Sequence, residues 1–211
     1  MAQIKRIPVY LVLDVSGSMQ DTIGSVKDGV NLCLQNLKED PRTKETACVG
    51  IITFESEVKE ILPLTRLQDI ADCPPLTTGG GTAFGSALLK VVDCAQAEVV
   101  KKTPDTPGDK KPMVFVMTDG EPTEDDAFVE QAIQDFNAYH WATVIPCAVS
   151  GASDRFLKKL GNAKGEIGIR LDNPSPDAFK KLFRIVSQSI ASGNFAAIAE
   201  AAKQDSSFSM L

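Results

Sequence analysis

Apolar runs of strand length alternate along this chain with segments in which apolar residues recur every three or four positions. The continuous runs favour strands that are covered on both faces, as in a parallel sheet. The periodic segments favour amphipathic helices. Strands that alternate with helices predict an α/β fold, a doubly wound and mainly parallel sheet with helices on both faces.

The predicted elements follow from these two patterns. Strands are expected at residues 8–13, 47–54, 58–62, 113–118, 141–149 and 166–171. Helices are expected at residues 23–37, 84–99, 129–136, 154–160 and 179–190. Only residues 55–57 separate the second strand from the third, which predicts a hairpin and therefore one antiparallel edge strand.

One domain accounts for most of the chain. The 211 residues fit a single large domain, which we assign to residues 1–192. Residues 193–211, "GNFAAIAEAAKQDSSFSML", predict a C-terminal extension that is partly helical or disordered. An Ala-rich helix can reach Lys203 at most, and residues 204–211 are expected to fray.

Net charge limits the expected partners, and cysteine content indicates the expected compartment. The formal net charge of -6 and the isoelectric point near 4.9 argue against nucleic acid or an anionic membrane. The five cysteines are widely spaced and form no Cys-x-x-Cys pair, which is typical of a reducing compartment. No segment has the roughly 18 apolar residues of a membrane span. We therefore expect a cytoplasmic protein.

Three polar segments lie next to the predicted strands and helices. "DVSGS" places Asp14, Ser16 and Ser18 directly after the first strand. "TTGGGT" ends with Thr82 at the entrance to the second helix, and "TDGEPT" places Asp119 directly after the strand at residues 113–118. Loops that leave the carboxyl ends of parallel strands meet at one edge of the sheet. These five side chains are therefore expected to lie together.

The five side chains offer only oxygen, which is the ligand atom that a hard divalent cation prefers. Zinc would favour histidine and cysteine, which the set lacks. We therefore predict Mg²⁺, with Mn²⁺ or Ca²⁺ as alternatives, and two ionised aspartates would balance its charge. Gly17 and residues 79–81 allow the backbone segments to approach closely. A vacant coordination position would accept a carboxylate from a partner protein.

Each segment alone also fits a simpler interpretation. Ser16, Ser18 and Thr82 favour helix N-caps and turns, and "DG" after a strand is a common turn. The joint occurrence of the three segments at one expected edge is what favours the metal. The polar residues after Asp119 are interpreted as the beginning of the next helix, where acidic side chains suit the helix dipole: Glu121, Thr123, Glu124, Asp125 and Asp126.

"DVSGS", "GGGT" and "TDG", in this order, resemble the metal-ion-dependent adhesion site (MIDAS) of the von Willebrand factor A (VWA) domain. The resemblance covers roughly residues 5–190 and implies a Rossmann-like fold. It also implies that the two serines and the threonine coordinate the metal directly or through water, with one or both aspartates acting through water. The metal positions would be Asp14, Ser16, Ser18, Thr82 and Asp119.

A narrower resemblance lies in "RIPVYLVLDVSGSM", "ITFESEVKEILPLT" and "GGGTAFGSALL". These stretches are similar to the bacterial TerY-like group, which is linked to tellurium resistance and stress signalling. The resemblance implies a protein kinase and a PP2C-type phosphatase as partners. Some members carry a zinc-binding segment near the C-terminus, but this chain has no cysteine after Cys147.

An enzyme is the main alternative class. A serine hydrolase needs a histidine base, but the single histidine, His140, precedes the strand at residues 141–149 and is expected at the opposite edge of the sheet. A Mg²⁺-dependent phosphatase or phosphotransfer domain would use Asp14 as nucleophile. Enzymes of the haloacid dehalogenase type carry a second aspartate two residues later, where this chain has Ser16. We therefore expect a non-catalytic adaptor; a purely structural adaptor without metal is the third option.

Overall fold

The computed structural model describes residues 5–138, 141–149, 151–160, 168–193, 200 and 203–211. Within this part of the chain the strands form one sheet in the order β3-β2-β1-β4-β5-β6-β7. The strands are β1 (Ile7–Asp14), β2 (Ala47–Phe54), β3 (Val58–Arg66), β4 (Met113–Thr118), β5 (Thr143–Val149), β6 (Ile169–Leu171) and β7 (Phe208–Met210). The five inner strands, β2, β1, β4, β5 and β6, pair in parallel. Strands β3 and β7 join the two edges of the sheet in the antiparallel direction.

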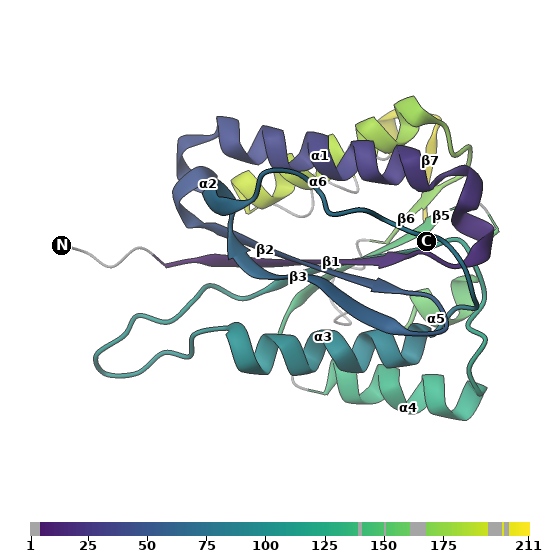
Figure 1. Cartoon of the computed structure of the whole chain (residues 1–211), viewed down its shortest axis with the longest axis horizontal. Coiled ribbons are helices and arrows are strands. Elements are labelled where there is room, and N and C mark those ends of the chain that lie inside the picture. The colour runs from purple at the N-terminus through teal and green to yellow at the C-terminus, as the bar shows by residue number, and fades with distance from the viewer. Residues whose placement is uncertain (1–4, 139–140, 150, 161–167, 194–199, 201–202) are drawn as a thin grey trace.

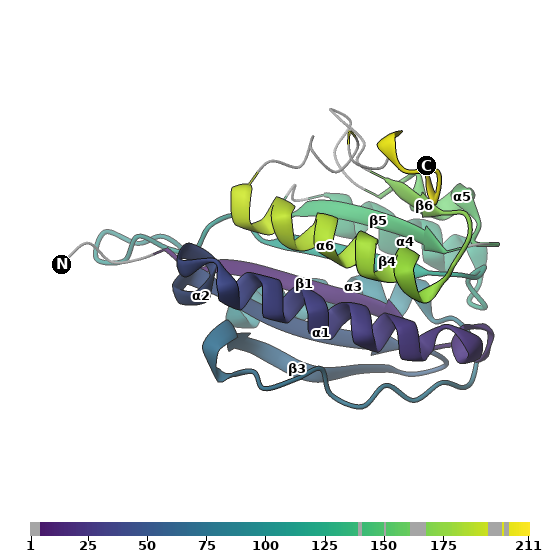
Figure 2. The same cartoon turned by 90° about the horizontal axis from the view of Figure 1, so that it is seen from above.

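Helices cover both faces of the sheet (Figure 1), as predicted. They are α1 (Ile23–Glu39), α2 (Pro41–Thr46), α3 (Phe84–Glu98), α4 (Asp126–Asn137), α5 (Asp154–Leu157) and α6 (Pro176–Ser192), with short 3-10 helices η1 (Gly17–Asp21) and η2 (Leu67–Asp69). Figure 2 shows α1 and α6 side by side over one face. No helix in the described part of the chain combines the length and the apolar character needed to cross a membrane.

Strand β1 shows why the sheet has two cores. All of its residues are buried, and alternate side chains point to opposite faces. Val9, Leu11 and Leu13 pack with α1 and α6, whereas Tyr10 and Val12 pack with α3 and α4. The continuous apolar run therefore belongs to a central strand with both faces covered.

The structure differs from the prediction in two places, after α1 and at the end of β3. Helix α1 ends at Glu39, as expected from "EDPR", but a second short helix begins at once. Asp40 accepts hydrogen bonds from the backbone of Arg42 and Thr43, and Pro41 occupies the first turn, so the same residues that end α1 start α2. Strand β3 reaches Arg66 rather than residue 62, because it stays paired with β2 as far as Cys48.

The C-terminal end differs from the expectation of fraying. Phe208–Met210 form β7, which pairs with β6 and gives the sheet a second antiparallel edge. Phe208 is buried, and Lys181 on α6 pairs with Asp205 at 2.7 Å ahead of the strand. Most of the expected Ala-rich helix, the start of the strand expected at residues 166–171, and His140 lie outside the described residues.

Candidate metal centre

Asp14 ends β1 with its carboxylate fully buried. One carboxylate oxygen accepts a hydrogen bond of 2.8 Å from the backbone nitrogen of Ser16. The other accepts a hydrogen bond of 2.5 Å from the Thr118 hydroxyl, at the end of β4. The first and third predicted loops are thus tied together at the edge to which the parallel strands point (Figure 1).

The two serine hydroxyls extend this arrangement. Ser16 Oγ and Ser18 Oγ lie 3.1 Å apart, and Ser18 Oγ donates a hydrogen bond of 2.6 Å to Asp119 Oδ1. An octahedral Mg²⁺ shell with metal–oxygen distances of about 2.0–2.1 Å has edges of about 2.9 Å. The oxygens of these residues are therefore spaced like neighbouring ligands in such a shell.

Thr82 reaches the same place from the second loop. A Cβ atom built on Gly120 would lie 3.6 Å from Thr82 Oγ1 and 3.9 Å from Ser18 Oγ, so the two hydroxyls flank one backbone position. Thr82 is only 5% exposed, and its hydroxyl makes no hydrogen bond within the described part of the chain. The structure thus brings together all five residues that the sequence singled out.

The electrostatics of the site favour a cation. Burial raises the pKa of the Asp14 carboxyl, and the nearby Asp119 carboxylate raises it further, whereas hydrogen bonds from Ser16 and Thr118 act in the opposite direction. A buried carboxyl group with a second carboxyl group beside it is a natural setting for a divalent ion.

Backbone contacts hold the glycine-rich segment ahead of Thr82. The Gly79 nitrogen donates to Val15 O at 3.0 Å, and the Gly17 nitrogen donates to Gly80 O at 3.3 Å. On the far side of Thr82, the Ala83 nitrogen donates to Glu55 O at 2.7 Å. The loops after β1 and β2 therefore fix the position of Thr82 from both sides.

The third loop is also tied to the second. The Thr82 nitrogen donates to Thr123 Oγ1 at 2.9 Å, and the Thr123 nitrogen donates to Thr82 O at 3.0 Å. This reciprocal pair was not predicted, because no local sequence signal marks a threonine that bonds to a distant backbone. Thr123 is thus a positioning residue for Thr82.

The acidic residues after Asp119 divide between two helices. Asp125 caps α4 by accepting from the backbone of Ala127 and Phe128, as predicted for the start of that helix. Glu124 instead caps α3, whose own N-cap residue, Ala83, has no side-chain acceptor. The Glu124 carboxylate accepts from the backbone of Gly85 and Ser86 and from the Ser86 hydroxyl.

Replacing Glu124 with alanine is expected to lower the free energy of unfolding by about 1–2 kcal/mol, because two partly buried amide donors at the start of α3 lose their acceptor. Urea denaturation measures this loss. The control is Glu121→Ala, which removes an exposed carboxylate from the same loop and is expected to be neutral. Equal stability of the two variants would contradict the capping role of Glu124.

A second cluster of potential ligands lies between β3 and α3. Glu60, Cys94 and Glu98 each offer one ligand atom, and these atoms lie within 4.8 Å of one another. Both Glu98 oxygens are already used, one by the Tyr10 hydroxyl at 2.9 Å and the other by the Leu64 nitrogen at 2.8 Å. Burial also raises the pKa of the Cys94 thiol to about 11, so this group stays protonated near neutral pH. We therefore assign no metal to this cluster.

Comparison with known proteins agrees with the fold. The family model of the von Willebrand factor type A domain matches residues 9–184. The chain belongs to this family. The α/β fold expected from the sequence is thereby confirmed for this VWA domain. No curated protein matches the chain significantly.

Solved structures of three other proteins resemble the domain. A von Willebrand factor type A protein from Catenulispora acidiphila has a TM-score of 0.68 at 16% identity and covers 89% of this chain and 43% of its own. Proximal thread matrix protein 1 from the mussel byssus, with a zinc-occupied MIDAS motif, has a TM-score of 0.63 at 21% identity and coverages of 89% and 48%. The pilus adhesin SpaC from Lactobacillus rhamnosus GG, in its open conformation, has a TM-score of 0.71 at 17% identity and coverages of 92% and 31%. The chain thus spans less than half the length of each.

Proposed function

We propose that this VWA domain is a non-catalytic binding module that holds a divalent ion and captures an acidic side chain of a partner protein. Ser16, Ser18 and Thr82 would hold the ion, assisted by Asp14 and Asp119. When bound, the ion supplies an open coordination position for the partner's carboxylate. The observation that carries this proposal is the convergence of three hydroxyls and two carboxylates from separate loops.

Mg²⁺ is the ion that we propose, because every donor in the set is an oxygen. The mussel protein with a zinc-occupied MIDAS motif supports a divalent ion at such a site without selecting one. Mn²⁺ and Ca²⁺ share the preference for oxygen and are the competing ions to compare.

A cavity beside the site gives the partner room around its acidic side chain. It has a volume of about 360 Å³ and lies between the β2–β3 turn and the glycine-rich segment. Val15 and Gly80 line it next to the metal residues, and Glu55, Glu57 and Lys59 line it on the β2–β3 side. Because this lining carries both negative and positive charge, it favours a partner with charged residues of both signs near its carboxylate.

The burial of Asp14 supports a binding role over the phosphotransfer alternative. A nucleophilic aspartate needs a free carboxylate oxygen that can approach phosphorus, but both Asp14 oxygens accept hydrogen bonds and the side chain is fully buried. Turnover of a phosphate ester that depends on Asp14 would overturn this part of the proposal.

The biological setting that we propose rests on the resemblance to the TerY-like group. It places the domain in the bacterial cytoplasm, in a tellurium-resistance or stress-signalling system with a protein kinase and a PP2C-type phosphatase as partners. The five buried and free cysteines are consistent with a reducing compartment.

Capture from a bacterial lysate on the immobilised domain tests the proposed function. Partners are expected to bind in Mg²⁺ and to be lost in EDTA and with Thr82→Ala, because the metal loses a ligand. The matched control is Thr65→Ala on β3, which pairs with Val49 at the other end of the sheet and should retain the same partners. Identical capture with and without EDTA, by both variants, would contradict the proposal.

A further inference from the structure

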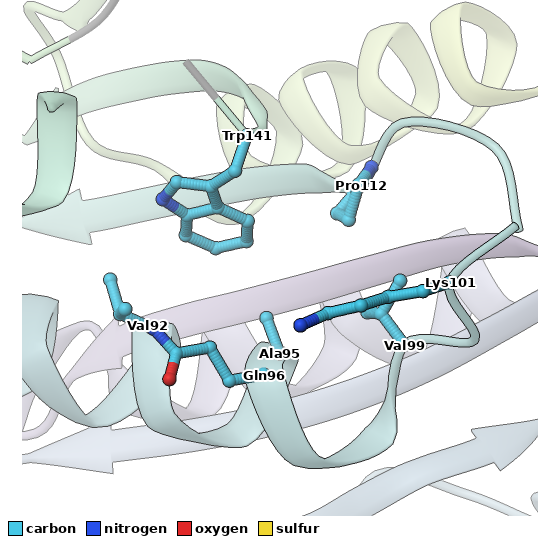
Figure 3. A pocket seen from close by; sticks show the side chains of 7 residues that line it. All are labelled: Val92, Ala95, Gln96, Val99, Lys101, Pro112 and Trp141. Atoms are coloured by element: carbon cyan, nitrogen blue, oxygen red, sulfur yellow. The ribbon is translucent and has the colours of Figure 1, made fainter. Parts of the chain in front are cut away.

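A groove lies at the other end of α3 from the metal residues. Its walls are the last turns of α3, with Val92, Ala95 and Val99, and the residues directly ahead of β4 and β5, Pro112 and Trp141 (Figure 3). The groove has a volume of about 450 Å³ and a mainly apolar lining. This volume is sufficient for one or two side chains of a ligand.

The indole of Trp141 forms a firm wall. Its nitrogen donates a hydrogen bond of 3.1 Å to Phe136 O, and its ring packs edge-on against the Phe136 ring at 5.6 Å. The polar end of the indole is therefore satisfied within the protein. A fixed aromatic surface of this kind binds apolar anchor residues of a partner at little cost in entropy.

Positive charge lies at this groove and along the loop that leaves it, although the whole chain is acidic. Lys101 lines the groove, and its side chain runs along it in Figure 3. The loop that begins there also carries three further exposed lysines: Lys102, Lys110 and Lys111. None of these four lysines makes an ion pair with a residue that the structure describes.

The loop holds its lysines on a fixed backbone. Arg6 binds Asp109 through both carboxylate oxygens, at 2.8 and 2.6 Å, which neutralises one of the loop's two acids and leaves Asp105 as the other. The Asp109 nitrogen donates to Val100 O, and the Lys110 nitrogen donates to Arg6 O, both at 2.9 Å. A charged loop that is already ordered loses less entropy when a partner binds.

We propose that this groove docks an acidic peptide segment of a partner protein. One branched or aromatic side chain of the peptide seats against Trp141, and neighbouring carboxylates pair with Lys101 and the other loop lysines. The apolar wall supplies the anchor, and the positive charge in an otherwise acidic chain supplies the selectivity for acidic sequences. The 15 residues of α3 separate the two ends by about 22 Å, so this site works independently of the metal.

Intrinsic fluorescence gives a local readout, because Trp141 is the only tryptophan in the chain. Peptides are selected from a random display library against the whole protein, and tryptophan-free winners are synthesised. They are expected to carry Asp or Glu beside Leu, Ile or Phe, and to shift the Trp141 emission saturably. The dissociation constant is expected to be the same in Mg²⁺ and in EDTA.

Two exposed positions test the groove without disturbing the core. Lys101→Glu is expected to weaken binding about fivefold to tenfold, since an attraction becomes a repulsion. Gln96→Glu places a carboxylate on the α3 wall and is expected to weaken binding about threefold. The matched controls are Lys180→Glu and Gln188→Glu, both exposed on α6, which packs on the opposite face of the sheet from α3, and they should bind like the wild type.

Four results would overturn the inference. The first is that the selected peptides contain no acidic residues, or that no selected peptide shifts the Trp141 emission. The second is equal binding by Lys101→Glu and Lys180→Glu. The third is binding of anionic phospholipid vesicles in place of peptides, which would assign the lysines to a membrane surface. The fourth is peptide binding that EDTA abolishes, which would place the peptide at the metal edge and so support the proposed function in place of the groove.

Discussion

Mg²⁺ at about 100 times its dissociation constant is expected to raise the free energy of unfolding of the wild-type domain by about 2.7 kcal/mol, and that of Asp14→Asn not at all. The ion binds the folded state, in which loops that are far apart in the sequence meet, and not the unfolded chain. Asparagine has nearly the shape of aspartate but no charge to offer the cation. Urea denaturation in MgCl₂ and in EDTA measures both effects.

Without metal, Asp14→Asn is expected to be at least as stable as the wild type near neutral pH. The folded-state pKa of Asp14 is raised, so the folded protein holds this proton more tightly than the unfolded chain does. In EDTA, the wild type therefore loses stability as the pH rises from the ordinary aspartate pKa of 3.8 through the higher pKa of Asp14 in the folded protein. Asp14→Asn lacks this loss, because its side chain does not titrate, and it should equal or exceed the wild type near neutral pH.

The control for both arms is Asp28→Asn, which removes an exposed carboxylate from α1. This variant should gain as much stability from Mg²⁺ as the wild type does. In EDTA it should also lose stability with rising pH as the wild type does. A wild-type domain that gains no stability from millimolar Mg²⁺ would contradict the metal site. An Asp14→Asn variant that is much less stable than the wild type in EDTA would assign a packing role to this carboxylate instead.

The metal residues were predictable because each stands at a marked place in the sequence. Asp14 and Asp119 directly follow continuous apolar strands, and Thr82 precedes a periodic helix. The parallel winding of the chain then determines that these places meet. A single sequence with clear strand ends is therefore sufficient to assemble a site from three distant loops.

The missed features depend on contacts that no local pattern records. Strand β7 is only Phe-Ser-Met, and it exists because the open edge of β6 accepts it. Glu124 lies among acidic residues that fit the start of α4, but its carboxylate reaches the amides of another helix. In both cases long-range pairing decides between alternatives that are locally equivalent.

The three glycines before Thr82 illustrate the same limit within the site. The sequence shows only that residues 79–81 are flexible. The structure distinguishes them, because Gly80 has φ +62° and Gly79 does not have positive φ. A Cβ atom on Gly80 would lie 2.5 Å from Ser56 Oγ and 3.0 Å from its nitrogen, whereas a Cβ atom on Gly79 would meet nothing within 4 Å.

Gly80→Ala is therefore expected to lower the free energy of unfolding by about 2–3 kcal/mol, and Gly79→Ala is not. An alanine in the left-handed region costs about 1–2 kcal/mol, and the contact with Ser56 adds to this cost. Gly79→Ala has space for its methyl group and should be neutral or stabilising by up to about 1 kcal/mol, since it restricts the unfolded chain. Urea denaturation in EDTA compares the two variants without any contribution from metal.

The same pair tests how far the loop controls the metal. Relief of the contact moves the backbone two residues ahead of Thr82, so the Mg²⁺ affinity of Gly80→Ala should fall about tenfold, or 1.4 kcal/mol. Gly79→Ala should bind Mg²⁺ like the wild type in a calorimetric titration. If the two variants instead lost stability and affinity equally, the whole segment would act as a flexible unit. The prediction that Gly80 specifically positions the Thr82 hydroxyl would then be wrong.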